Sequence, residues 1–421
     1  MDFLSGMVKS LKHTVFILTL SCTFTILNAQ VKNLNEYINA AIANSPSLKE
    51  NALQQMQTGI DSSIAIADYR PQISANGVGY YAPVYGQYGY DQAISNGGEY
   101  AALISISQQI SPRNEISLKR RLASDERSRL HADSKVKENE LRKEVTDEYL
   151  NACLLQQRLV FYIQSDSFLT QQNKIVKMLA DKGSYKISDY YELLVEEKSE
   201  RTQIARLKID MEQAFSVLNS SCGIMDTVQY TLPIPDIQLT EKTDVTQLAV
   251  YQEFRADSVK LTTQDKLVDA GYRPRFSWYA DAGILASQPN LISRSIGNSI
   301  GLNLTVPIYD GDKRKLKHQS LQLSQDSRLN YQNFFEQNYN NRIVFLAKQI
   351  VDSRKLIIQL QQEEQEVKHW IDIDQAELAA GNIPVTDFLL SLKKNLEVKN
   401  DLNEALINQQ SLQNEFNYRN R

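Results

Sequence analysis

Apolar residues recur at a spacing of seven in the second half of the chain. The isoleucines on this spacing are Ile343, Ile350, Ile357 and Ile371. Three further apolar residues lie between them, namely Leu346, Leu360 and Val367. A seven-residue period is typical of a coiled coil, in which one apolar stripe of a helix packs against a partner helix. The pattern therefore predicts a long helix that packs against others.

Glycine and proline are missing from four long segments, and their absence sets the expected helix lengths. These segments are 113–182, 184–222, 312–380 and 385–421. At a rise of about 1.5 Å per residue, 312–380 spans about 104 Å, whereas 385–421 spans only about 56 Å. A helical pattern at 244–271 adds about 42 Å to this length. In the first half of the chain, a helical pattern at 48–68 adds in the same way to the length of the helix in 184–222. Each long helix is thus predicted to pack against two shorter helices placed end to end.

The two halves of the chain also share a motif and an order of elements. Tyr-Arg-Pro occurs at 69–71 and again at 272–274, each time before a strand-like segment. Repetition of this kind indicates one architecture built from two structural repeats. We expect a first repeat at 30–230 with a β-hairpin at 72–111, a linker at 231–243, and a second repeat at 244–421 with a β-hairpin at 275–310. The turns of the two long helical hairpins are predicted near 183–189 and 381–387.

Apolar and polar residues alternate in the strand-like segments. The apolar positions that fall on one side are Ile104, Ile106, Leu302, Leu304 and Val306. Alternation over about ten residues is typical of a membrane β-barrel strand, with one side toward lipid and the other toward water. A soluble sheet gives the same pattern. Tyrosines concentrated at 80–100 favour the membrane interpretation, because aromatic residues gather at bilayer interfaces.

Two β-hairpins give only four strands, which are too few to close a barrel. An open strand edge is unfavourable in lipid, because its backbone groups have no partner there. A barrel would therefore require several copies of the chain, and three copies would supply about twelve strands.

Composition narrows the function classes further. Residues 1–29 join a basic start to a short apolar stretch and a small residue, as in a secretory signal peptide. The net charge of −4 makes the chain a poor binder of nucleic acid. The histidines lack metal-ligand spacing and no catalytic motif is present, so we expect no enzyme activity, metal or cofactor. Cys153 and Cys222 are expected to stay unbonded, because they lie at different heights along the predicted helical hairpin.

The chain resembles the TolC-like outer membrane efflux proteins over nearly all of its length beyond residue 29. The resemblance rests on the strand starts "YRPQIS" and "YRPRFSW" and on "LNLTVPIYDGDKRK" at 302–315. It rests also on the two turns, "DKGSYKISDYYELL" at 181–194 and "AAGNIPVTDFLLSL" at 379–392. Each turn carries a glycine followed six residues later by an aspartate. One such turn is a weak motif, but two at the ends of matched helices are specific.

The resemblance implies a homotrimer in the outer membrane of a Gram-negative cell, with a twelve-stranded barrel and a tunnel of coiled-coil helices in the periplasm. Its partners would be a periplasmic adaptor, an inner-membrane transporter and outer membrane lipids, and it would passively export small molecules or proteins. Residues implied at the adaptor-docking tips are Gly183, Ile187, Gly381 and Val385. Residues implied at the periplasmic gate are Asp189 and Asp387, for which helix capping is an alternative role.

The chain departs from the family pattern around the second turn. Positions where the family places a tyrosine, an arginine and a second acidic residue hold Leu378, Ile383 and Leu390. Other contacts must therefore hold any closed state.

Two interpretations stay open at this point. Basic runs at 119–121 and 313–317 begin the long helices, and they either meet lipid headgroups or form solvated faces. The whole chain, in turn, has the alternative of being a soluble periplasmic coiled-coil adaptor or scaffold.

Overall fold

The computed structural model describes residues 31–110, 113–226 and 228–421. The predicted signal peptide, 1–29, lies outside the described residues. The described residues are 71% helical and carry one small sheet, so the expected mostly helical fold is confirmed. None of the described helices is both long and apolar enough to cross a membrane.

The long helices have the lengths that the glycine- and proline-free segments predicted. Helix α5 (Arg113–Asp181) has 69 residues and α8 (Lys313–Ala380) has 68. Helices α6 (Ile187–Ser221) and α9 (Val385–Arg419) have 35 residues each. Helices α3 (Pro46–Ala67) and α7 (Ala249–Gly271) have 22 and 23. The short elements are α2 (Leu34–Asn44), α4 (Gln92–Ser95) and two 3-10 turns, η1 (Val245–Gln247) and η2 (Pro289–Arg294).

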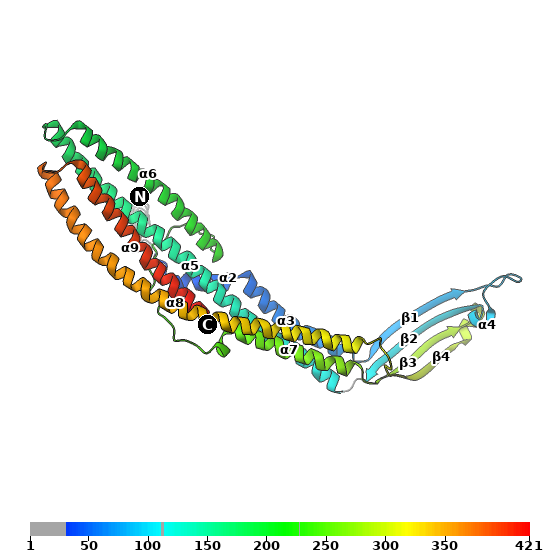
Figure 1. The fold of residues 1–421 in the computed structure, drawn as a ribbon. Helices are drawn as coiled ribbons and strands as arrows, with labels where there is room; N and C mark the ends of the chain where they lie inside the picture. Colours follow the sequence, from blue (N-terminus) through cyan, green and yellow to red (C-terminus); the bar gives the residue numbers. More distant parts are fainter. Residues whose placement is uncertain (1–30, 111–112, 227) are drawn as a thin grey trace, which may run out of the picture. The chain divides into compact units, whose positions relative to one another are not determined.

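Four antiparallel strands form a single sheet in the order β1-β2-β3-β4 (Figure 1). They are β1 (Gln72–Tyr81), β2 (Gly98–Ile110), β3 (Arg275–Ala286) and β4 (Ile296–Thr305). Strand β4 ends one residue before Val306, which the sequence pattern had placed in the strand. The next residue is Pro307, which has no backbone N–H with which to continue the ladder.

The chain forms two compact units, and each draws on both halves of the sequence. The unit that holds the helical turns comprises the described residues up to Asn44, with Leu141–Leu239 and Ala347–Phe416, and is called the tip unit below. The unit that holds the sheet comprises Ser45–Glu140, Thr240–Leu346 and Asn417–Arg421, and is called the sheet unit.

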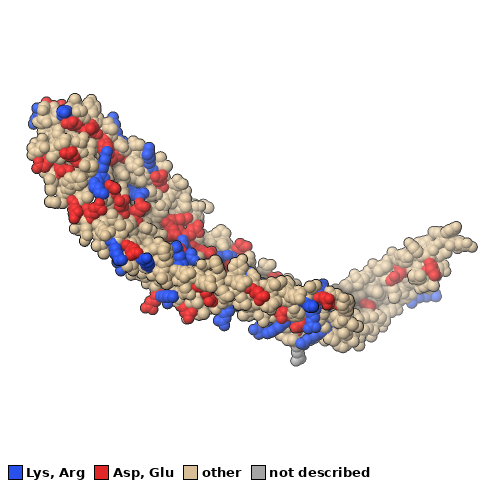
Figure 2. Space-filling model, viewed as in Figure 1, with Lys and Arg blue, Asp and Glu red and all other residues tan. Residues whose placement is uncertain are grey.

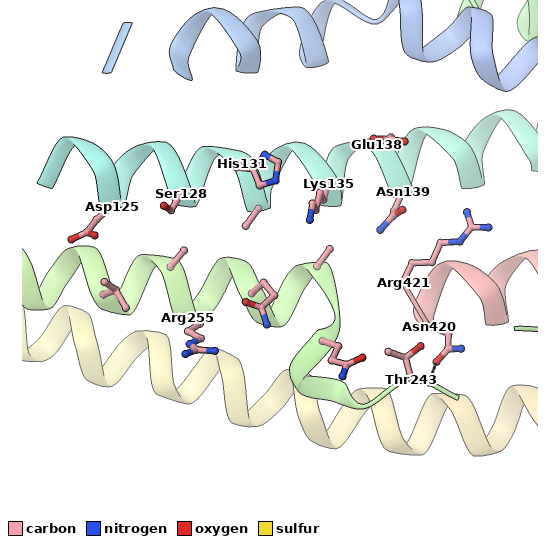
Figure 3. Close-up of a pocket in the computed structure, with 16 residues that line it drawn as sticks. Asp125, Ser128, His131, Lys135, Glu138, Asn139, Thr243, Arg255, Asn420 and Arg421 are labelled. Carbon is pink, nitrogen blue, oxygen red and sulfur yellow. Dashed lines mark hydrogen bonds between the residues drawn. The ribbon is translucent and has the colours of Figure 1, made fainter. Parts of the chain in front are cut away.

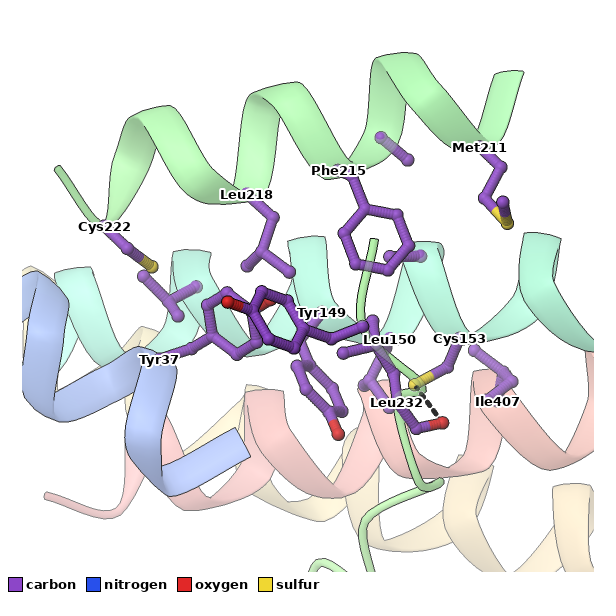
Figure 4. Packing of buried hydrophobic residues seen from close by; sticks show 14 of the residues in the cluster. Tyr37, Tyr149, Leu150, Cys153, Met211, Phe215, Leu218, Cys222, Leu232 and Ile407 are labelled. Atoms are coloured by element: carbon purple, nitrogen blue, oxygen red, sulfur yellow. Dashed lines mark hydrogen bonds between the residues drawn. The ribbon is translucent and has the colours of Figure 1, made fainter. Parts of the chain in front are cut away.

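The largest apolar core of the tip unit lies where α2 packs on α5 and α6 (Figure 4). The rings of Tyr37 and Tyr149 meet edge to face with centroids 5.7 Å apart. The hydroxyl of Tyr149 donates a hydrogen bond to the carbonyl oxygen of Pro233 at 2.8 Å. Cys153 and Cys222 are buried in this core as free thiols, as expected, and burial raises the pKa of each to about 12. Neither thiol is therefore a reactive thiolate at neutral pH.

The predicted linker is an extended segment held by side chains that cap its backbone. In the tip unit, the amide of Leu232 donates to Gln156 Oε1 at 2.9 Å. In the sheet unit, the amide of Thr240 donates to Asn417 Oδ1 at 2.9 Å, and that of Thr243 to Asn420 Oδ1 at 2.7 Å. These bonds satisfy backbone groups that no strand or helix pairs.

Candidate functional site

Both helical hairpins of the tip unit turn at a glycine in the left-handed conformation. Gly183 has φ of +82° and Gly381 has φ of +80°. After each glycine, one amide reaches back over the end of the helix. Ser184 N donates to Leu179 O, and Asn382 N to Glu377 O, each at 2.9 Å. This pattern ends a helix by satisfying its last carbonyl groups, and it favours glycine because other residues are strained at positive φ.

The two gate candidates lie in the first turn of the helix that follows, but their surroundings differ. Asp189 is partly buried, and its Oδ2 accepts the backbone N–H of Lys186 at 3.2 Å, which is a capping contact. Asp387 is exposed, and within the described part of the chain its carboxylate has no hydrogen-bond or ion-pair partner. Of the two aspartates, only Asp189 therefore caps its helix with its side chain.

A contact that the sequence analysis missed joins the two turns. The hydroxyl of Tyr185 lies 2.7 Å from the carbonyl oxygen of Ile383 and 3.0 Å from that of Leu378. It can donate to either oxygen, and partial burial raises the pKa of Tyr185, which keeps the donor proton in place. Tyr185 therefore joins the turn between α5 and α6 to the turn between α8 and α9.

An apolar core lies directly behind the turns and draws on α5, α6, α8 and α9. Its most buried members include Leu169, Leu193, Leu378, Val385 and Phe388. Val385 is only 1% exposed, although the resemblance had implied it as a docking residue, whereas Ile187 is 60% exposed. Gly183 and Gly381 are also exposed. A partner can therefore reach Gly183, Ile187 and Gly381 but not the side chain of Val385.

A groove runs between the first turns of α6 and α9 and holds about 620 Å³. Exposed apolar side chains line it, namely Tyr191, Val195 and Leu390. An ion pair crosses it, because Lys393 Nζ lies 3.2 Å from Glu196 Oε2. The groove combines apolar surface with charge, as a docking site for a protein helix does.

Two buried glutamates lie one turn apart on α6, facing α5. Glu200 is 4% exposed, and its Oε1 accepts a hydrogen bond from Ser165 Oγ at 2.9 Å. Its other oxygen has no partner in the structure, and burial raises the pKa of Glu200 to about 7. Glu197, by contrast, is bonded to Asn173 and Arg201.

In the sheet unit, the register divides the strands into an apolar and a polar face. Ile104 pairs with Ala75 and Ala282, and Leu302 pairs with Trp278. Directly paired residues share a face, and residues two apart along a strand do so as well. Ile104, Ile106, Leu302 and Leu304 therefore lie on one face, as the alternation predicted. On the other face Asn303 pairs with Ser277, and Ser299 Oγ donates to Asp281 Oδ2 at 3.2 Å.

The apolar face is uncovered in the single chain. Leu302 is 84% exposed, Ile300 79% and Leu304 53%. A contiguous apolar surface of this kind marks a contact with a membrane or a protein. Its facing toward lipid stays a prediction.

A crevice of about 730 Å³ in the sheet unit lies between α5, α7 and the C-terminal residues (Figure 3). Charged side chains of both signs line it, including Lys135, Glu138 and Arg255, together with His131. Over the described ranges, no cluster of three or more His, Cys, Asp or Glu side chains is arranged to hold a metal ion.

No protein-family model matches the chain, and no curated protein matches its sequence. Solved structures do match its fold. The Campylobacter jejuni CmeC outer membrane channel gives a TM-score of 0.76 at 12% identity, over 92% of this chain and 85% of that chain. The open state of the Neisseria gonorrhoeae MtrE outer membrane channel gives 0.71 at 14% identity, over 92% and 88%. The outer membrane protein VceC of Vibrio cholerae gives 0.71 at 14% identity, over 92% and 94%.

The chain therefore has the fold of the outer membrane channels. At these identities the likeness shows the fold alone.

Proposed function

We propose that the protein is an outer membrane channel-tunnel that passively exports small molecules or proteins, in a tripartite efflux pump or a type I secretion system. The observation that carries the proposal is one sheet with an exposed apolar face and a polar face, joined in sequence to helices of nearly seventy residues. The apolar face suits lipid and the polar face a water-filled lumen. Residues 1–29 would be the signal peptide that directs the chain to export.

The working form would be a homotrimer. Strands β1 and β4 are the outer strands of the sheet, so each has one side that no strand of the described chain pairs. In a membrane such edges must be paired, and closure with other copies does so. Three copies would give a barrel of about twelve strands, with Ile104, Ile106, Leu302, Leu304 and, just beyond β4, Val306 toward lipid.

The tip unit would form the periplasmic mouth. Three copies of Asp387, which is exposed and unpaired in the described chain, would bring like charges together at the gate. Asp189 would act beside it by holding the start of α6 in place. Gly183, Ile187 and Gly381 would contact the periplasmic adaptor, which in turn would connect the channel to an inner-membrane transporter. Val385 would support these residues from inside.

The boundaries expected from the sequence fit this assignment. The repeats at 30–230 and 244–421 would each supply one β-hairpin and one helical hairpin to every subunit. The linker at 231–243 would lie at the equator of the tunnel.

Fractionation and electrophoresis of the full chain test the proposal. We expect the protein in the outer membrane fraction, migrating unboiled as a trimer that boiling converts to a monomer. The purified trimer should form ion-conducting pores in a planar bilayer. A soluble monomer without conductance would overturn the proposal and favour a periplasmic adaptor or scaffold.

A further inference from the structure

Basic residues gather at one end of the sheet. This is the end at which β1 and β3 begin and β2 and β4 end, because alternate strands of the antiparallel sheet run in the same direction. We call the following residues the basic collar: Arg70, Lys119, Arg120, Arg121, Arg273, Arg275, Lys313, Arg314, Lys315 and Lys317. All of them lie within a few turns of a strand end. Figure 2 shows Lys and Arg side chains where the helices of the sheet unit meet the sheet.

The opposite end of the sheet lacks such a collar. The two connections there, 82–97 and 287–295, contain one basic residue, Arg294, and one acidic residue, Asp91. Exposed tyrosines take their place, including Tyr85 and Tyr88. The charge on the sheet unit is therefore concentrated on the helix side of the sheet.

Part of the collar is occupied by contacts within the chain. Arg314 Nη2 lies 2.6 Å from Asp269 Oδ1, and Lys119 Nζ lies 4.7 Å from the ring centroid of Tyr69. The remaining lysines are different. Lys313, Lys315 and Lys317 are exposed, and they form no ion pair with any residue that the structure describes.

The apolar face continues up to these free lysines. Leu304 and Phe276, paired at the end of the sheet, are 53% and 52% exposed. Beyond the strand, Ile308 is 95% and Tyr309 84% exposed, four to five residues before Lys313. Lys313 and Lys317, four residues apart, share one face of α8, whereas Lys315 lies on another face. Exposed apolar surface that meets unpaired cations is complementary to an amphiphile with an anionic headgroup.

We propose that the basic collar binds the phosphate headgroups of anionic glycerophospholipids whose acyl chains lie on the apolar face. This inference rests on the proposed function, because it requires the sheet to be in a bilayer. Lys313 and Lys317 supply charge to the headgroup from one face of α8, and Lys315 adds to the positive potential around it. The guanidinium groups of Arg120 and Arg273 supply donors that match phosphate oxygens in pairs. Each basic residue at an anionic membrane surface contributes about fivefold to binding.

Tryptophan fluorescence of the full-length trimer provides the test. The sequence has two tryptophans, Trp278 and Trp370. Trp278 lies on the apolar face, paired with Leu302, so Trp370→Phe leaves one reporter beside the bound lipid. The protein is reconstituted in mixtures of phosphatidylcholine and phosphatidylglycerol in which only one of the two lipids carries brominated, quenching chains. The ratio of quenching by the two lipids measures the preference for the anionic headgroup.

We expect the parent to prefer phosphatidylglycerol by about fivefold or more. Replacing Lys313, Lys315 and Lys317 by Gln should bring that ratio close to one. The matched control changes three exposed lysines of the tip unit to Gln. These lysines are Lys174, Lys348 and Lys368, and the control should keep the parent ratio. Free phosphate is the other source of the same chemistry. If the detergent-solubilised parent binds inorganic phosphate through the three lysines while the quenching ratio of the two lipids stays close to one, the collar binds free phosphate and the lipid assignment is overturned.

The outcomes distinguish the inference from the function on which it rests. If neither brominated lipid quenches Trp278, the sheet is not in the bilayer and the proposed function fails. If both lipids quench it equally in the parent, the sheet is in the bilayer and the basic collar is only a solvated face. A loss of preference in the control as large as in the collar variant would also overturn the inference, because net charge alone would then explain it.

Discussion

Tyr185 and Ile383 occupy matching positions in the two halves of the chain, and the hydroxyl of the first lies 2.7 Å from the carbonyl oxygen of the second. Each follows its turn glycine, Gly183 or Gly381, by two residues. The two hairpin turns are thus connected by a contact between equivalent positions of an internal repeat. Only one of the two copies carries the donor, so the repeat is asymmetric at the place where the proposed gate would open.

Removing that donor should loosen the turns. Tyr185→Phe removes the donor that lies 2.7 Å from the carbonyl oxygen of Ile383 at a partly buried site, which costs about 1 to 2 kcal/mol. We expect faster hydrogen exchange of the amides at 378–388 and a higher single-channel conductance. Tyr191→Phe removes a hydroxyl from an exposed ring on α6 and should change neither quantity. Unchanged exchange and conductance in Tyr185→Phe would show that the contact does not hold the turns together.

The proposed acidic ring should make the pore sensitive to multivalent cations. In a trimer, three Asp387 carboxylates repel one another, and a bound trivalent cation relieves that repulsion. Asp387→Asn should weaken block by a trivalent cation from the periplasmic side by at least about tenfold, which is about 1.4 kcal/mol of binding. Trimer assembly should be unaffected, because the side chain has no partner in the described chain.

Asp189→Asn serves as the comparison for that block. It disturbs the capping contact with Lys186, so we expect it to raise conductance more than it relieves block. Equal block of the parent and of Asp387→Asn would place the ring elsewhere.

Neighbouring residues of β4 should differ in their tolerance of charge. Leu302→Arg places a cation on the apolar face, at a cost of about 2 to 4 kcal/mol if the site is near the bilayer midplane. Asn303→Arg places the same cation on the polar face, toward the proposed lumen. We expect trimers of the second variant but few of the first on an unboiled gel. Equal assembly of the two variants would show that the assigned facing is wrong.

The α5–α6 hairpin should be less stable at alkaline than at acidic pH. Glu200 ionises with a pKa of about 7 in the folded chain and 4.5 when unfolded, because burial disfavours its charged form. The folded state therefore binds more protons between these values, and stability falls as the pH rises from 4.5 to 7 and is then level. Glu200→Gln should remove this dependence and stabilise the hairpin at pH 8 by roughly 1 to 3 kcal/mol.

Hydrogen exchange of α5 and α6 amides at several pH values, corrected for intrinsic rates, measures that effect. Glu192→Gln changes an exposed carboxyl of the same helix and should keep the parent's pH dependence. If Glu200→Gln also keeps it, another group is responsible.

Local sequence patterns predicted the long helices and the two faces of the sheet. Runs without glycine or proline located α5, α6, α8 and α9 to within a few residues, because those two residues are what ends a long helix. Strand alternation placed Leu302 and Leu304 on the same face, because side-chain direction in a strand has a strict period of two. The burial of Val385 was also readable, since Val385, Phe388 and Leu392 follow helical spacing.

Contacts between distant segments were not readable in the same way. The hydroxyl of Tyr185 bonds to backbone carbonyl oxygens at 378 and 383. Every residue has such an oxygen, so the residue types at these positions do not predict the contact. The raised pKa of Glu200 arises from helices packed around it, and its sequence neighbours resemble those of any exposed glutamate. Helix α2 is short, and the periodicity did not predict it.

The two outer strands of the sheet have a consequence for how the protein matures. A newly folded single chain presents two rows of unpaired backbone groups along β1 and β4, which readily pair with any other strand they meet. In the proposed trimer, completing the sheet would be an encounter between molecules, so its rate would rise with the concentration of chains. At low concentration, chains would spend longer with these strand edges unpaired. The time available for mispairing would then depend on how quickly the cell delivers further copies.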